Sequence, residues 1–76
     1  MTSTIDQRVG HRIRVRRVDL NLSQEDLAEA LGISQGYLSS LERGVRSLDV
    51  KLLERIAQAL KCSMAELLDE KGKAAR

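Results

Sequence analysis

The feature that most constrains this chain is the absence of proline from a sequence rich in leucine and alanine. Both residues have high helix propensity, and proline is the residue that breaks helix interiors. The chain has one tyrosine and no phenylalanine or tryptophan, so aliphatic side chains must form almost the whole core. The composition therefore favours an all-α fold.

The length of 76 residues allows one small domain. A single cysteine, Cys62, excludes an internal disulfide, and no group of cysteines and histidines has the spacing of a metal site. A chain of this size without such links needs efficient apolar packing or a partner subunit. We expect neither a metal nor a cofactor.

No segment of the sequence marks the chain for a membrane or for export. No apolar stretch approaches the roughly 20 residues that span a bilayer. The first four residues lack the charged and then apolar layout of a signal peptide. A single cysteine also fits a reducing compartment, so we expect a cytoplasmic protein.

The net charge of +2 is unevenly distributed along the chain. The first twenty residues carry five arginines, whereas the stretch that follows them is acidic. Arg8, Arg12 and Arg16 share one face of the first predicted helix. This stripe either extends a basic surface for nucleic acid or pairs with Glu25 and Glu29.

Hydrophobic periodicity, capping residues and stop glycines together predict five helices. The N-cap candidates are polar residues that stand before an apolar period, namely Thr4, Ser23, Ser34, Asp49 and Ser63. Gly32 and Gly44 end the second and third helices. The predicted helices span residues 4–18, 23–31, 34–43, 49–60 and 63–70. They form one domain over residues 1–70, followed by a short charged tail at 71–76.

The second and third predicted helices are joined by a tight turn around Gly32. Ala28 is small at the point where the two helices cross. Two short helices joined in this way form a helix-turn-helix, the arrangement of many DNA-binding proteins. Such pairs also occur in other all-α proteins, so the spacing alone permits DNA binding without establishing it.

Several segments share a pattern with one known family. They are LSQEDLA at 22–28, LGIS at 31–34, LERG at 41–44, Arg46 and residues 53–60. Over about residues 5–68 the chain resembles the Xre/Cro-type helix-turn-helix family of phage repressors and restriction-modification controller proteins. Leu48 departs from the pattern, since the family often has proline there. The resemblance implies a compact five-helix fold like that of the lambda repressor, with the third helix in the major groove.

The outward side of the third helix is expected to contact DNA bases. The residues assigned to this role are Gln35, Tyr37, Ser39 and Ser40. A glutamine can pair bidentately with adenine, and the small serines favour water-mediated or shape readout. Tyr37 either touches DNA at the groove edge or covers the fourth or fifth helix. Gly36 either permits close approach of the backbone to DNA or is merely tolerated near the helix start.

A second set of residues is expected to contact DNA phosphates. The set comprises Gln24, Ser34, Arg43 and Arg46. The resemblance assigns Gln24 to a phosphate, and a helix N-terminus also attracts anions. Arg43 and Arg46 flank Gly44 after the third helix, where backbone N–H groups of Gly44 and Val45 would assist them.

Two charged residues stand at positions that favour burial. Arg17 falls on the apolar stripe of the first helix, and Glu42 lies off the outward stripe of the third. Buried charges need partners. The resemblance pairs these two positions, so we assign Arg17 and Glu42 to a structural ion pair and not to DNA.

The end of the chain is rich in apolar side chains for a terminal helix. We expect part of this surface to cover the core and the remainder to form a two-fold dimer interface. The residues predicted for the interface are Leu60, Met64, Leu67 and Leu68. Such a dimer would bind two half-sites about 34 Å apart.

We therefore expect a sequence-specific transcriptional regulator that binds a palindromic double-stranded DNA operator as a homodimer, with residues 34–43 in the major groove. An enzyme is not expected, because His11 and Cys62 lack catalytic partners. Repression by blocking RNA polymerase and activation by contacting it remain open, and no small-molecule effector is expected. The protein would associate with the nucleoid when bound. The alternative is a protein-interaction module, such as an antitoxin or anti-repressor.

Overall fold

The computed structural model describes residues 4–68, which form five helices and no strand. The helices are α1 (Thr4–Asp19), α2 (Gln24–Leu31), α3 (Gln35–Glu42), α4 (Val50–Ala59) and α5 (Met64–Leu68). Every predicted helix is present, with the predicted N-cap residues of α2 to α5 standing one position before each helix. The predicted end of the last helix at residue 70 and the tail at 71–76 lie outside the described residues.

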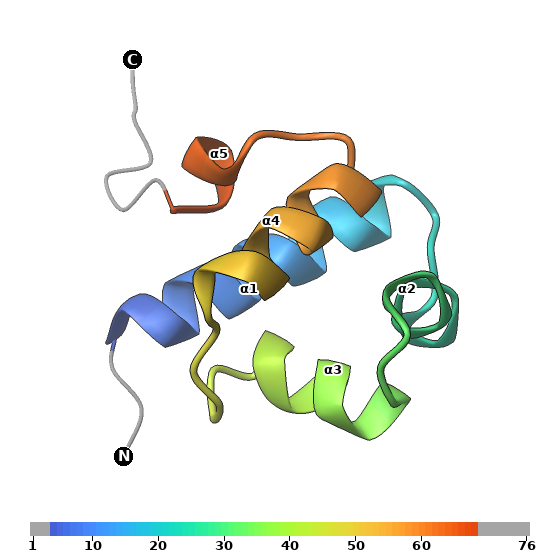
Figure 1. The fold of residues 1–76 in the computed structure, drawn as a ribbon, viewed down its shortest axis with the longest axis horizontal. Coiled ribbons are helices and arrows are strands. Elements are labelled where there is room, and N and C mark those ends of the chain that lie inside the picture. Colours follow the sequence, from blue (N-terminus) through green and yellow to red (C-terminus); the bar gives the residue numbers. More distant parts are fainter. Residues whose placement is uncertain (1–3, 69–76) are drawn as a thin grey trace.

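The five helices pack around a single core, and α1 and α4 cross the centre of the view in Figure 1. α3 lies below them in this view, α2 lies at the right and α5 lies above. α1 contacts α3 and α5, and α2 contacts α3 and α4. Within residues 4–68 no helix combines the length and the apolar character that a bilayer crossing requires.

Hydrogen bonds at the predicted caps explain where the helices begin. Ser23 Oγ accepts from the N–H of Asp26 at 2.9 Å, and the Asp26 carboxylate accepts from the N–H of Ser23 at 3.0 Å. These bonds lower the pKa of the Asp26 carboxyl, with the backbone N–H of Ser23 as the largest cause. Ser63 and Glu66 form the second reciprocal box, at 3.1 Å for each backbone donor.

The starts of α3 and α4 have simpler caps. Ser34 Oγ accepts from the N–H of Tyr37 at 3.0 Å, and Asp49 Oδ1 accepts from the N–H of Leu52 at 2.7 Å. Asp49 sets the start of α4 although Leu48 replaces the proline of the family pattern. For α1 the helix includes Thr4 itself, so the prediction of Thr4 as its N-cap is wrong, and any cap before it lies outside the described residues.

Aliphatic side chains fill the core, as the composition predicts. The largest side chains with less than 2% exposure are Ile13, Leu27, Leu38, Leu41, Ile56 and Leu60. They come from α1 to α4 and from the residue that follows α4. Burial of each such side chain contributes about 1.5–3 kcal/mol, so the core is the main source of stability.

Two residues of the predicted dimer interface belong to this core. Leu60 is 0% exposed and Leu67 is 2% exposed, so neither can contact a second copy while the domain stays folded. The prediction for these two residues is wrong, because apolar spacing does not reveal which apolar side chains at the end of α4 and on α5 face inward. Met64 is half-buried, and Leu68 remains 42% exposed.

A buried ion pair joins α1 to the end of α3. Arg17 Nε lies 2.6 Å from Glu42 Oε2, and Arg17 Nη2 donates to Glu42 Oε1 at 3.0 Å. The third guanidinium nitrogen, Nη1, donates to the carbonyl of Leu22 at 2.7 Å. Arg17 is 8% exposed and Glu42 is 6% exposed. The sequence predicts this burial, because Arg17 falls on the apolar stripe of the first helix and Glu42 lies off the outward stripe of the third. This paired geometry satisfies both charges, which burial alone would make costly.

α1 and α3 also approach too closely for an added side chain. A Cβ on Gly10 would lie 2.7 Å from the carbonyl oxygen of Glu42 and nearer still to that of Leu41. Gly44, with a φ of +75°, would place a Cβ 2.5 Å from the Cα of Gln7. Because the obstructing atoms belong to the backbone, the two helices would have to move apart.

Gly10→Ala should destabilise the domain by about 1–3 kcal/mol or more, because overpacking forces backbone shifts. In a domain of this size that lowers the melting temperature by roughly 5–20 °C in a circular dichroism melt. Gly36→Ala is the matched control. A Cβ there meets nothing within 4 Å, so its melting temperature should stay equal or rise. Equal destabilisation by both variants would contradict the close crossing.

Arg17→Ala should lower thermal stability far more than Arg14→Ala. Loss of one partner leaves Glu42 as an uncompensated buried charge, at a cost of about 3–5 kcal/mol. Arg14 is exposed, so its removal should change stability by about 0.5 kcal/mol or less. Thermal melts of the two variants under one buffer measure the difference, and equal melting temperatures would exclude a structural role for Arg17.

Candidate nucleic-acid interface

α2 and α3 are joined by the tight turn that the sequence predicts. Gly32 has a φ of +72°, in the left-handed region that glycine adopts without a Cβ penalty. The N–H of Gly32 donates to the carbonyl of Glu29 at 3.2 Å, and that of Ile33 donates to Ala28 at 3.0 Å. Ala28 is 3% exposed where the helices meet. The pair therefore has the geometry of a helix-turn-helix.

α3 has one buried face and one exposed face. Leu38 and Leu41 are 0% exposed and attach the helix to the core. On the other side, Gln35 and Gly36 are exposed in the first turn. Ser39, another predicted base contact, is half-buried. The first turn of α3 is therefore the part of the helix most accessible to a large partner.

The remaining side chains assigned to bases are less accessible than Gln35. Ser40 is half-buried, and so is Tyr37, which packs against the edge of the core. The fold itself does not require glycine at position 36, because a Cβ there would enter open space. Internal packing therefore does not account for Gly36, and both explanations drawn from the sequence stay open.

Gln24 lies at the start of α2, beside the buried ion pair. Its side-chain Nε2 donates to Glu42 Oε1 at 3.0 Å. An amide nitrogen has two N–H donors, so this bond leaves a second one for an anion. The contact fixes the amide group close to the N-terminus of α2, where helix dipole and backbone donors also favour negative charge.

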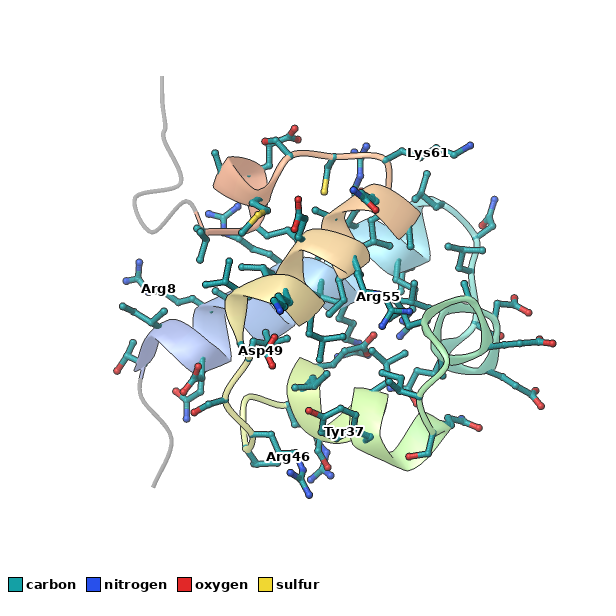
Figure 2. All side chains as sticks on the ribbon, viewed as in Figure 1. Arg8, Tyr37, Arg46, Asp49, Arg55 and Lys61 are labelled. Carbon is teal, nitrogen blue, oxygen red and sulfur yellow. The ribbon has the colours of Figure 1, made fainter. Side chains whose placement is uncertain are left out.

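The loop after α3 carries two arginines assigned to phosphates. Arg43 and Arg46 are both exposed. The Arg46 guanidinium carbon lies 4.9 Å from the centroid of the Tyr37 ring, and Figure 2 shows both residues on the side of the molecule formed by α3 and this loop. The loop thus presents positive charge directly beside the exposed face of α3.

The backbone donors expected to assist these arginines are used inside the protein. The N–H of Gly44 donates to the carbonyl of Leu41, and that of Val45 donates to Ser40, both at 3.1 Å. The prediction that they assist phosphate binding is therefore wrong. These bonds instead close the end of α3, because the last carbonyls of a helix need external donors.

Two arginines outside the predicted set hold helix ends together. Arg16 donates to the carbonyls of Leu60 and Lys61 at 3.0 and 2.9 Å, and Arg55 donates to Leu31 at 2.6 Å. Neither alternative for the arginine stripe foresaw this role of Arg16. The sequence has no signal for these contacts, because each joins helices that are far apart along the chain.

No feature of the described residues points to metal binding or to a reactive thiol. Among residues 4–68 no group of three or more histidine, cysteine, aspartate or glutamate side chains lies close enough to hold a metal ion. Burial raises the pKa of the half-buried Cys62 thiol, and the nearby Glu66 charge raises it further. A raised pKa disfavours the thiolate that nucleophilic chemistry needs.

Comparison with known proteins identifies the family. The model of the helix-turn-helix family matches residues 13–67, which is most of the chain. The chain is 38% identical over 64 residues to SinR, an HTH-type transcriptional regulator of Bacillus subtilis, covering 83% of this chain and 58% of SinR. It is 36% identical over 70 residues to the control protein C.BamHI of Bacillus amyloliquefaciens, covering 91% of this chain and 86% of C.BamHI. The chain spans 40–58% of the length of the first curated relatives that it matches.

Solved structures agree with the sequence relatives. A solved chain of the clp gene regulator ClgR from C. glutamicum has a TM-score of 0.85 and 36% identity, over 92% of this chain and 90% of that solved chain. The structure of SinR in complex with DNA has a TM-score of 0.75 and 35% identity, over 80% of this chain and 98% of that solved chain. The predicted all-α fold is confirmed, and these similar proteins are regulators. The chain belongs to the Xre-type helix-turn-helix family of transcriptional regulators.

Proposed function

We propose that this chain binds a palindromic operator in double-stranded DNA as a homodimer and thereby regulates transcription. The observation that carries the proposal is the exposed first turn of α3, together with two groups that lie against the same helix: the Gln24 amide bonded to Glu42 and the Arg46 guanidinium over Tyr37. A helix presented in this way, with phosphate-binding groups beside it, fits the major groove.

Direct base readout is assigned mainly to Gln35. It is the first residue of α3 and is exposed, so its amide can reach the N6 and N7 atoms of an adenine. Ser39 and Ser40 are half-buried and short, so they would act through water or through van der Waals contact. Tyr37 would lie at the groove edge. Few long side chains read bases, so the shape of the DNA should contribute to specificity.

Phosphate contacts are assigned to polar groups before and after α3. Gln24 begins α2, and Ser34 caps α3, where it can donate its hydroxyl hydrogen while its oxygen accepts from Tyr37. Arg43 and Arg46 follow α3 and supply the positive charge.

The proposed dimer uses the apolar residues of α5 that the core leaves accessible. Met64 is half-buried and Leu68 is 42% exposed. Contact of this face with a second copy would present two recognition helices to half-sites about one helical turn apart. Regulation in the cytoplasm would follow from operator occupancy, through blocking RNA polymerase or through contact with it, without a small-molecule effector.

The electrostatic part of the proposal predicts a steep salt dependence. An operator is first selected from a random pool of duplex DNA, and its affinity is then measured against salt concentration. Two arginines in each subunit should give a log–log slope of about −4 or steeper, at roughly −0.9 for each neutralised phosphate. Arg43→Gln should make the slope shallower by about 2, since a dimer loses two contacts.

Lys61→Gln is the matched control for this experiment. It removes the same charge at an exposed position after α4, on the side of the molecule opposite Tyr37 and Arg46 (Figure 2). Its slope should equal that of the wild type. Failure of the wild type to retain any duplex DNA at low salt would favour the protein-interaction module instead.

Leu68→Lys should convert a dimer to a monomer in sedimentation equilibrium at micromolar concentration, because it places a charge in an apolar interface. Val18→Lys is the control, since Val18 is 53% exposed on α1 and lies outside the proposed interface. Circular dichroism should show both variants folded. A wild type that remains monomeric at high micromolar concentration would contradict the homodimer.

A further inference from the structure

Tyr37 and Arg46 form a contact that neither residue's assigned role requires. The guanidinium carbon of Arg46 lies over the Tyr37 ring, 4.9 Å from its centroid. Tyr37 is the only phenylalanine, tyrosine or tryptophan in the chain, so no other such ring is available to any arginine. Both residues lie at the candidate interface (Figure 2). The contact joins the first turn of α3 to the loop that follows the helix.

The ring is the fixed member of the pair. Tyr37 is half-buried against the edge of the core, and its backbone N–H is held by Ser34 Oγ at 3.0 Å. Arg46 is exposed in the loop between α3 and α4, outside any helix. Ordering a long arginine side chain costs conformational entropy. A side chain already resting on a fixed surface loses less of that entropy when it binds a ligand.

Contact with the ring does not compete with phosphate binding. The ring attracts the cation through its π face. The guanidinium hydrogen bonds run from N–H groups at the edges of its plane, in a fixed fork geometry that suits phosphate oxygens. One guanidinium can therefore rest on Tyr37 and donate to a phosphodiester at the same time.

We propose that Tyr37 is a positioning residue, whose ring holds Arg46 in place for a backbone phosphate beside the major groove. This inference rests on the proposed function and gives Tyr37 a role other than base contact. The ring, and not the hydroxyl group, is then the part of Tyr37 that matters. The ligand is a phosphodiester, and its sequence is irrelevant to this contact.

A double-mutant cycle on binding to the selected operator tests the proposal. Tyr37→Phe keeps a ring and should bind within about twofold of the wild type. Tyr37→Leu keeps apolar packing but removes the ring, and should weaken binding about 2- to 5-fold for each half-site, the change expected for an exposed cation–π contact. In an Arg46→Gln background, Tyr37→Leu should have no further effect, because nothing remains to be positioned.

Two results would overturn the proposal. A loss with Tyr37→Phe as large as that with Tyr37→Leu would assign the effect to the hydroxyl group. An equal loss from Tyr37→Leu with and without Arg46 would show that Tyr37 acts alone. In both cases the wild type still binds DNA and the proposed function stands. A wild type that binds no duplex DNA would refute the proposed function together with this role of Tyr37.

A measurement without DNA tests the contact itself. In proton NMR spectra of the free protein, the ring should shift the δ-methylene protons of Arg46 upfield in the wild type and in Tyr37→Phe. The shift should disappear in Tyr37→Leu, and thermal melts should show that all three proteins are folded. Identical Arg46 proton shifts in the wild type and Tyr37→Leu would overturn the proposal, because no positioning contact would then exist.

Discussion

The arrangement of the first three helices depends on one buried ion pair. Arg17 contributes all three guanidinium nitrogens, two of them to Glu42 and the third to the carbonyl of Leu22. The same Glu42 carboxylate accepts from Gln24 at the start of α2. One guanidinium and one carboxylate thereby join α1, the segment before α2, and the end of α3. A pair with every bond satisfied imposes a specific geometry that apolar contacts alone do not impose.

This geometry determines what the protein can present to a partner. The close crossing at Gly10 fixes α1 against the end of α3, and the Gly32 turn fixes the angle between α2 and α3. Leu38 and Leu41 hold the inner face of α3, so its first turn is left exposed. Glu42, the last residue of α3, also holds the Gln24 amide, so the ion pair that stabilises the fold contacts a residue of the candidate interface directly.

Local sequence signals predict the helices well, and they predict contacts between helices only in part. The caps Ser23, Asp49 and Ser63 can be predicted from the sequence, because each capping hydrogen bond joins residues only three positions apart. Arg17 and Glu42 could be paired because a charge on an apolar stripe needs a partner, and because the family pattern supplies one. The sequence does not reveal that Leu60 and Leu67 are buried, because their inward orientation depends on how α5 packs against α1 and α4.

The contacts that sequence reasoning missed all depend on the positions of distant segments in space. Arg16 and Arg55 reach carbonyls at the ends of other helices, and Arg46 reaches the ring of Tyr37 from a loop. None of these contacts has a local spacing that would reveal it. The net charge does not reveal the candidate interface either, because it counts arginines in internal hydrogen bonds together with arginines exposed to solvent.

The most direct test of the account is amide chemical-shift mapping of the protein during titration with its selected operator duplex. The account predicts that the largest changes occur at Gln24 and across residues 34–46, while Val15 and Val18 on the outer side of α1 change little. Large changes confined to α1 or α5, with residues 34–46 unaffected, would contradict a DNA interface built on α3.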